Sequence, residues 1–188
     1  VAIGELAETV LPEVDLVANR WLFQHLTQTF DRRVLKVLSR GEDTDLHSSF
    51  SINLNVDTLM SPEFLDFDAS LRMGSRGTIV IEVQLVDIFA DIPGFMFARD
   101  FVREKGYRVC LDGVNSASLP FVDRRKLGVD LVKIFWSQDM LAAGDGDNQA
   151  NDTVREAIGQ IGKSRVIFAR CDSPTSIRAG QGLGVTMF

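Results

Sequence analysis

Ile79-Val80-Ile81-Glu82 is one of four short apolar runs that decide the fold of this chain, each carrying a polar residue near its end. The other three runs are Ser51-Ile52-Asn53-Leu54, Val109-Cys110-Leu111-Asp112 and Leu131-Val132-Lys133-Ile134. A buried charge is costly unless it is paired or bound to a metal ion. An amide, two carboxylates and an ammonium at equivalent strand ends therefore predict one shared pocket.

The spacing of these runs predicts a parallel sheet. Stretches of roughly twenty to thirty residues separate the last three runs, which is what a crossover helix and two loops require. Runs of Val, Ile and Leu with little alternation are typical of strands that helices cover on both faces. Such a series of units either opens into a doubly wound sheet or closes into a barrel, and both place ligand sites at the carboxyl ends of the strands.

The composition is that of a soluble globular domain. The chain has 188 residues, of which 45% are hydrophobic and 24% charged, and its formal net charge is −6. A length of this size predicts one domain. Binding to DNA, RNA or an anionic membrane requires a basic face, which the chain does not offer, so we expect neither class of partner.

The apolar runs, the first residues and the two cysteines indicate the cellular compartment. No apolar run is long enough to span a membrane, and Val1-Ala2-Ile3-Gly4-Glu5 does not resemble a signal peptide, so we expect a cytoplasmic protein. Cys110 and Cys171 are expected to be reduced packing residues. Because Val1 is not a methionine, we expect the sequence to be a fragment of a longer chain.

Periodicity and capping residues predict six strands alternating with helices. The expected helices cover 5–10, 14–30, a segment starting at Ser61, 94–105, 116–126, 152–161 and 174–178. The expected strands cover 50–56, 78–84, 107–112, 130–135, 164–169 and 184–188. Six strands are too few for a closed barrel of eight, so the sheet is open or two strands lie upstream of Val1.

The polar strand ends, in their order along the chain, resemble the EAL-domain family of cyclic di-GMP phosphodiesterases. The matching segments are Asn53-Leu54-Asn55, Ile81-Glu82-Val83, Leu111-Asp112-Gly113 and 127–134, together with Leu6-Ala7-Glu8-Thr9. The family patterns are Asn-x-Ser, Glu-x-Thr-Glu, Asp-Asp-Phe-Gly-Thr-Gly and Pro-Val-Asp-x-x-Lys-Ile-Asp. The resemblance implies a modified TIM-like (β/α)8 barrel, with residues 1–188 forming a single EAL-like domain that lacks the first two strands and ends within the last.

The resemblance also assigns roles to particular residues. Asn53, Glu82 and Asp112 fall on metal-ligand positions, and Lys133 falls on the lysine that positions the attacking water or the phosphate. Oxygen ligands of this kind suit hard divalent ions such as Mg²⁺, which activate water for phosphodiester hydrolysis.

Several catalytic carboxylates of the family pattern are replaced in this chain. The glutamate of Glu-Ala-Leu is absent, and the second aspartate of Asp-Asp is Gly113. The second glutamate of Glu-x-Thr-Glu is Leu85, the glutamate of Ala-Glu-Gly-Val-Glu is Arg170, and the aspartate after Lys-Ile is Phe135. A two-metal site needs several carboxylates, so we expect the remaining ligands to be vestigial and no cofactor to bind.

We therefore hypothesise that Arg170 and Lys133 pair with Glu82 and Asp112 in place of the metal ions. The favoured function is a catalytically inactive EAL-like module that regulates bacterial cyclic di-GMP signalling through a protein partner or as a homodimer, with 116–126 as the dimer face. One alternative is a nonhydrolytic receptor, in which Lys133, Arg170 and Arg178 bind the phosphates of cyclic di-GMP. The other is a working magnesium-dependent phosphodiesterase. The alternative for these polar residues is a self-satisfied buried ion network without a function, since such networks are common.

Overall fold

The computed structural model describes residues 19–40, 49–72, 74–140 and 149–188. Its helices are α2 (Arg20–Ser39), α3 (Pro62–Ser70), α4 (Leu85–Ala90), α5 (Ile92–Glu104), α6 (Arg124–Leu127), α7 (Gln149–Ile161) and α8 (Pro174–Gly182). Its strands are β1 (Phe50–Asn53), β2 (Ile79–Gln84), β3 (Arg108–Val114), β4 (Leu131–Phe135) and β5 (Val166–Ala169). Single 3-10 turns include η1 (Val56–Met60), η2 (Ser75–Thr78) and η3 (Leu119–Phe121).

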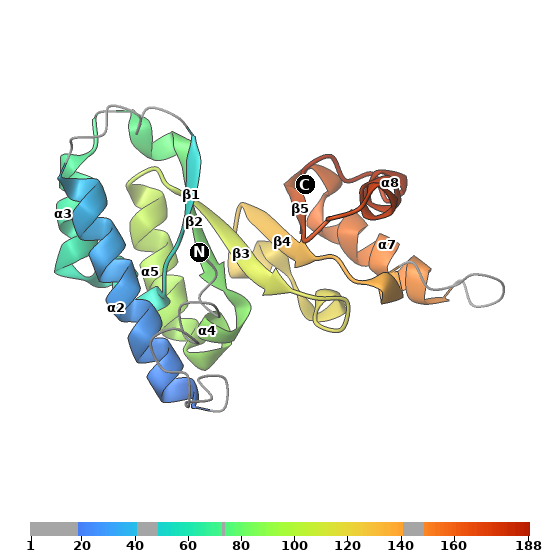
Figure 1. Ribbon diagram of the computed structural model, residues 1–188, viewed down its shortest axis with the longest axis horizontal. Helices are drawn as coiled ribbons and strands as arrows, with labels where there is room; N and C mark the ends of the chain where they lie inside the picture. The colour runs from blue at the N-terminus through green and yellow to red at the C-terminus, as the bar shows by residue number, and fades with distance from the viewer. Residues whose placement is uncertain (1–18, 41–48, 73, 141–148) are drawn as a thin grey trace.

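The five strands form one parallel sheet in the order β1-β2-β3-β4-β5. Each strand pairs with the next one along the chain, as in a barrel, whereas a doubly wound sheet reverses its order at a switch point. The sheet is curled, with α2, α3 and α5 at its β1–β3 end and α7 and α8 at its β5 end (Figure 1). The α/β fold is thus part of a TIM-like barrel. Of the two architectures that the sequence allowed, the strand order favours the barrel over the doubly wound sheet.

The two faces of the sheet differ in chemistry because side chains alternate along each strand. One face carries Ile81, Val109, Leu111 and Ile134, which are fully buried in the core with Phe64 and Phe95 from the covering helices. The alternate positions carry Glu82, Cys110, Asp112 and Lys133. Apolar burial on the first face holds the sheet against its helices, and this leaves the second face for polar groups.

Most predicted elements are present, with corrected bounds. Ser61 caps α3 as expected, its hydroxyl accepting from the Phe64 amide at 3.2 Å. The strand predicted over 50–56 ends at Asn53, since the chain turns into η1. The predicted helix over 14–30 is observed from Arg20 and runs on to Ser39; its earlier part, like the predicted helix over 5–10, lies outside the described residues.

Two predictions were wrong in kind, and one element was not predicted. The helix expected over 116–126 is reduced to η3 and the single turn α6, which Asp123 caps. The sequence reasoning missed α4 entirely, because six residues are too few to show helical periodicity. The sixth strand, over 184–188, is only one bridge between Ile167 and Met187. Within the described residues, no helix is long and apolar enough to cross a membrane.

Candidate functional site

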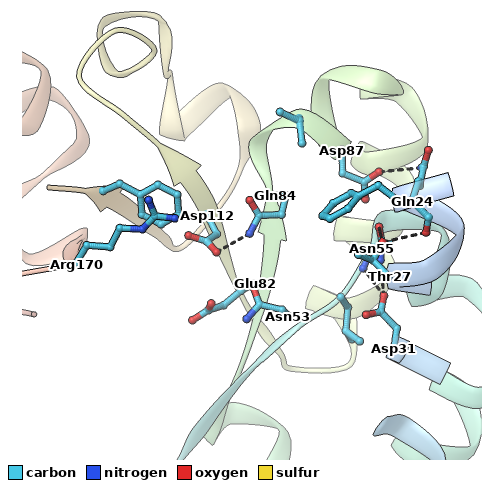
Figure 2. A pocket seen from close by; sticks show the side chains of 14 residues that line it. Gln24, Thr27, Asp31, Asn53, Asn55, Glu82, Gln84, Asp87, Asp112 and Arg170 are labelled. Atoms are coloured by element: carbon cyan, nitrogen blue, oxygen red, sulfur yellow. Dashed lines mark hydrogen bonds between the residues drawn. The ribbon is translucent and has the colours of Figure 1, made fainter. Parts of the chain in front are cut away.

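A cavity of about 600 Å³ opens at the carboxyl ends of the strands. Figure 2 shows its polar side chains, which converge from the sheet, from α2 and from the segment after β5. The lining residues are Phe23, Gln24, Thr27, Asp31, Asn53, Leu54, Asn55, Glu82, Gln84, Val86, Asp87, Asp112, Phe135 and Arg170. The three residues expected as vestigial metal ligands therefore share one cavity, as predicted from their positions at the strand ends.

Glu82 and Lys133 form an ion pair across the sheet. Lys133 Nζ donates to Glu82 Oε2 at 2.5 Å, and the side chains are 21% and 4% exposed, respectively. Burial alone would lower the pKa of Lys133, but the hydrogen bond and charge of Glu82 outweigh it, so the pKa is raised. This half of the hypothesised charge replacement is present.

Asp112 is held by an amide instead of a cation. Gln84 Nε2 donates to Asp112 Oδ2 at 2.7 Å, and the Gly113 amide donates to Oδ1 at 2.7 Å. Gln84 stands opposite Asp112 in the pairing of β2 with β3, so the contact follows from register. Asn53 stands opposite Glu82 in the pairing of β1 with β2.

Neither Arg170 nor Arg178 makes the contacts that the sequence led us to expect. Arg170 has a left-handed backbone, with φ of 62°, and its guanidinium lies 4.0 Å from the centroid of the Phe135 ring. Among the described residues it forms no ion pair, so the expected pairing of Arg170 with Glu82 or Asp112 is wrong. Arg178 Nε donates to the Pro174 carbonyl at 3.2 Å and does not line the cavity.

The opposite wall of the cavity is a hydrogen-bonded junction between α2 and the segment that follows β1. Asp31 Oδ2 accepts from the backbone and side-chain amides of Asn55, both at 2.7 Å, and from Thr58 Oγ1 at 2.9 Å. Asp87 Oδ2 accepts from the Val56 amide at 2.6 Å, and Gln24 Nε2 donates to Asp87 Oδ1 at 3.3 Å. Burial raises the pKa of Asp31, the hydrogen bonds from Asn55 and Thr58 partly offset this, and the nearby Asp87 charge adds to the rise.

The sequence reasoning missed these α2-side residues and Gln84. One signal was available, because Asp31 falls four residues after Thr27 and four before Leu35, on the buried stripe of the helix. An acid on such a stripe is expected to have a buried partner.

The described residues of the cavity offer few free oxygen ligands to a divalent metal ion. Within the described ranges, no three His, Cys, Asp or Glu side chains gather closely enough to hold an ion. Glu82 Oε2 is paired with Lys133, and both carboxylate oxygens of Asp112 accept hydrogen bonds, from Gln84 and from the Gly113 amide. A metal ion at Glu82 would compete with the Lys133 ammonium for the carboxylate.

The cavity is acidic overall. Asp31, Glu82, Asp87 and Asp112 line it, against Arg170 in the lining and Lys133 on Glu82. The cavity thus has four acidic side chains against two basic ones.

Comparisons with known proteins identify the fold. No protein-family model matches the chain, and no curated protein matches it in sequence. The Xanthomonas citri FimX EAL domain in complex with c-di-GMP has a TM-score of 0.64 and 13% identity over 95% of this chain and 71% of that chain. The Bacillus subtilis YkuI protein, with an EAL domain, in complex with substrate c-di-GMP and calcium gives 0.60 and 15%, over 86% and 42%.

The apo S helix-GGDEF-EAL segment of Vibrio cholerae LapD gives a TM-score of 0.59 at 16% identity, over 88% of this chain and 42% of that chain. This chain thus spans less than half the length of the LapD and YkuI chains. The described fold is EAL-domain-like, which confirms the resemblance drawn from the strand-end residues.

Proposed function

We propose that the chain is a catalytically inactive EAL-like domain that serves cyclic di-GMP-type signalling through contacts with a protein partner. The observation that carries this proposal is the Lys133–Glu82 ion pair at 2.5 Å. It places a fixed ammonium against one of the few remaining acids. The Gln84–Asp112 hydrogen bond occupies the other remaining acid of the strand ends.

A two-metal hydrolase has to supply several carboxylates to its ions. In this chain Gly113, Leu85 and Phe135 stand where the family pattern has acids. The proposal therefore includes no metal cofactor, and no hydrolytic step is assigned to Lys133.

A nonhydrolytic receptor for cyclic di-GMP is the second candidate. Arg170 at the cavity mouth, stacked on Phe135, offers a guanidinium for a phosphate and is the observation that favours it. FimX and YkuI were solved in complex with c-di-GMP. The excess of acidic over basic side chains around the cavity opposes a dianionic ligand, so we rank this candidate below the interaction module.

The deciding experiment is calorimetric titration of the purified chain with cyclic di-GMP, with and without Mg²⁺ or Mn²⁺, followed by chromatography of the products. We expect neither heat nor linear product. Heat without product would replace the proposal with the receptor, and loss of that heat in Arg170→Gly, which suits the left-handed backbone, would locate the phosphate.

Linear dinucleotide formed at an ordinary turnover would overturn the proposal in favour of a phosphodiesterase. The matched control is Glu82→Gln, because hydrolysis by this site has to disappear with that carboxylate, whereas a contaminating activity persists.

A further inference from the structure

The apolar side of helix α2 is not its buried side. The buried positions of the helix are Thr27, Asp31 and Leu35, at intervals of four residues. Two of these three are polar, and both hydrogen-bond to Asn55 in the segment after β1. A helix on a core ordinarily turns its apolar stripe inward. In α2 a polar junction takes that place, and an apolar stripe is left on another side of the helix.

The apolar stripe of α2 consists of five residues, Phe23, Leu26, Phe30, Val34 and Val37. At about 100° per residue, these positions fall within about 80° of one another around the helix axis. The exposed fractions of Phe23, Val34 and Val37 are 37%, 46% and 65%, and the other two side chains are partly exposed. None of the five belongs to the hydrophobic core of the described residues. The stripe is thus one continuous apolar surface on one helix.

The spacing of the stripe is symmetrical about Phe30. Its intervals are three, four, four and three residues, so two antiparallel copies of the helix place Phe30 opposite Phe30. Phe23 then lies opposite Val37, and Leu26 lies opposite Val34. Both of these pairs set a larger side chain against a smaller one, which is how facing positions of packed helices interdigitate. A twofold axis through the middle of the stripe makes the surface complementary to itself.

The charges of α2 do not oppose this pairing, and the stripe itself carries none. Lys36 pairs with Glu63 of α3, and Arg32 lies one turn before Lys36 on the same side of the helix. Arg33 flanks the stripe. In the antiparallel pair its level on the axis is six residues from that of its counterpart, about 9 Å, which is close to the screening length at ordinary salt.

We infer that α2 pairs with α2 of a second copy of this chain, antiparallel, about a twofold axis at Phe30. The helix runs along the outside of the β1–β3 end of the sheet (Figure 1). A single helix pair buries less than the ~1,200 Å² of a standard interface, so the dimer is weak, with a dissociation constant of about 10–100 μM. The inference goes beyond the proposed function and does not depend on whether the cavity hydrolyses cyclic di-GMP.

The test is sedimentation equilibrium of the purified chain from about 1 to 300 μM, a range that brackets the expected dissociation constant. We expect Val37→Glu and Phe30→Glu each to raise that constant at least about tenfold. The matched control is Phe97→Glu, at a position that is 66% exposed on α5, which should dimerise as the parent does. Val37→Glu keeps the test decisive if Phe30→Glu unfolds, because an exposed valine contributes little to stability.

A disulfide between copies tests the twofold axis directly. In a Cys110→Ala/Cys171→Ala background, we expect Phe30→Cys to link two copies in the presence of oxidised glutathione. Residues that face each other on the axis come within the ~4.4–6.8 Å between Cα atoms that a disulfide spans. Arg32→Cys, on the α3 side of the same helix, is the control and should link much more slowly.

A chain that stays monomeric over the whole concentration range would overturn the inference, as would a dimer that Val37→Glu leaves intact. Equal rates of linking for Phe30→Cys and Arg32→Cys would exclude the antiparallel pairing about Phe30. A dimer that Phe121→Glu breaks and Val37→Glu does not would assign the pairing to the 116–126 face expected from the sequence, since Phe121 is 82% exposed there. The proposed function is tested separately, by the cyclic di-GMP titration.

Discussion

At the scale of single residues, the Lys133–Glu82 ion pair offsets the free energy cost of burying the Glu82 carboxylate. Removal of one partner of a buried pair leaves an uncompensated charge, which costs about 3–5 kcal/mol. We predict a loss of that order in the free energy of unfolding for Lys133→Met, measured by urea denaturation. The double variant Lys133→Met/Glu82→Gln should recover most of the loss, because the charge is gone.

Lys36 provides the matched control for this prediction. It pairs with Glu63 at 3.5 Å, but its side chain is 63% exposed, so Lys36→Met should not change the unfolding midpoint measurably. If Lys133→Met changes the unfolding midpoint as little as Lys36→Met does, water must reach the Glu82 carboxylate. The ion pair would then be no argument against a metal site.

Gly113 and Gln84 form a second residue-scale pair. Gly113 has φ of 82°, and a Cβ built on it would lie 2.7 Å from Gln84 Oε1. Any side chain at position 113 would therefore have to displace the Gln84 side chain, whose amide bonds to Asp112. We predict that Gly113→Ala destabilises the fold, and that the loss is smaller in a Gln84→Ala background, because only the backbone strain then remains.

The double-mutant cycle from the four urea titrations measures this coupling. Equal cost of Gly113→Ala in both backgrounds would mean that Gln84 moves aside freely and does not occupy the position of the missing acid.

At the scale of elements, Asp68 at the end of α3 fastens three segments at the amino-terminal end of the sheet. Its carboxylate accepts from Arg76 at 2.6 Å, from Lys105 at 2.7 Å and from the Tyr107 hydroxyl at 2.9 Å. Burial alone would raise the pKa of Asp68, but these three hydrogen bonds outweigh it and lower the pKa to about 2. Burial of the Tyr107 hydroxyl, together with its hydrogen bond to Asp68 and the charge of that carboxylate, raises the pKa of Tyr107.

The sign of the pH dependence follows from this lowered pKa. A carboxyl group with a lower pKa in the folded state stabilises it above the unfolded pKa of about 4, and the contribution is lost as pH falls toward 2. We predict that stability falls across this interval, and that the fall becomes shallower in Asp68→Asn, in urea titrations at a series of pH values. Asp66→Asn, at an exposed position of α3, serves as the control; an unchanged slope in Asp68→Asn would contradict the assignment.

The elements also show how far sequence reasoning reached. Runs such as Ile79–Glu82 were predictable as strands because apolar continuity is dictated by burial on a covered sheet. The meeting of Asn53, Glu82 and Asp112 in one cavity was predictable because parallel strands end at one edge, whereas Lys133 contacts Glu82 without lining the cavity. The Gln84–Asp112 bond depends on register, and the Asp31 junction depends on how α2 packs; neither is encoded in local spacing.

At the scale of the whole molecule, one sheet separates an apolar core from an acidic cavity, and Cys110 on the central strand β3 lies between them. Its side chain is fully buried, and burial, with the Glu82 charge, raises the pKa of the thiol to about 12. Cys171, after β5, is partly exposed. Only the thiolate is nucleophilic enough to react with a thiol reagent. Because burial keeps the Cys110 thiol protonated, Cys110 has to become exposed to water before it reacts.

We predict that Cys110 reacts only through global unfolding. In a Cys171→Ser background, its labelling rate should fall below that of an unfolded peptide by the factor that corresponds to the free energy of unfolding measured in urea. In the converse Cys110→Ser background, Cys171 should react without unfolding. If Cys110 is labelled faster than global unfolding allows, the cavity side of the sheet opens locally. Water would then also reach the Lys133–Glu82 ion pair.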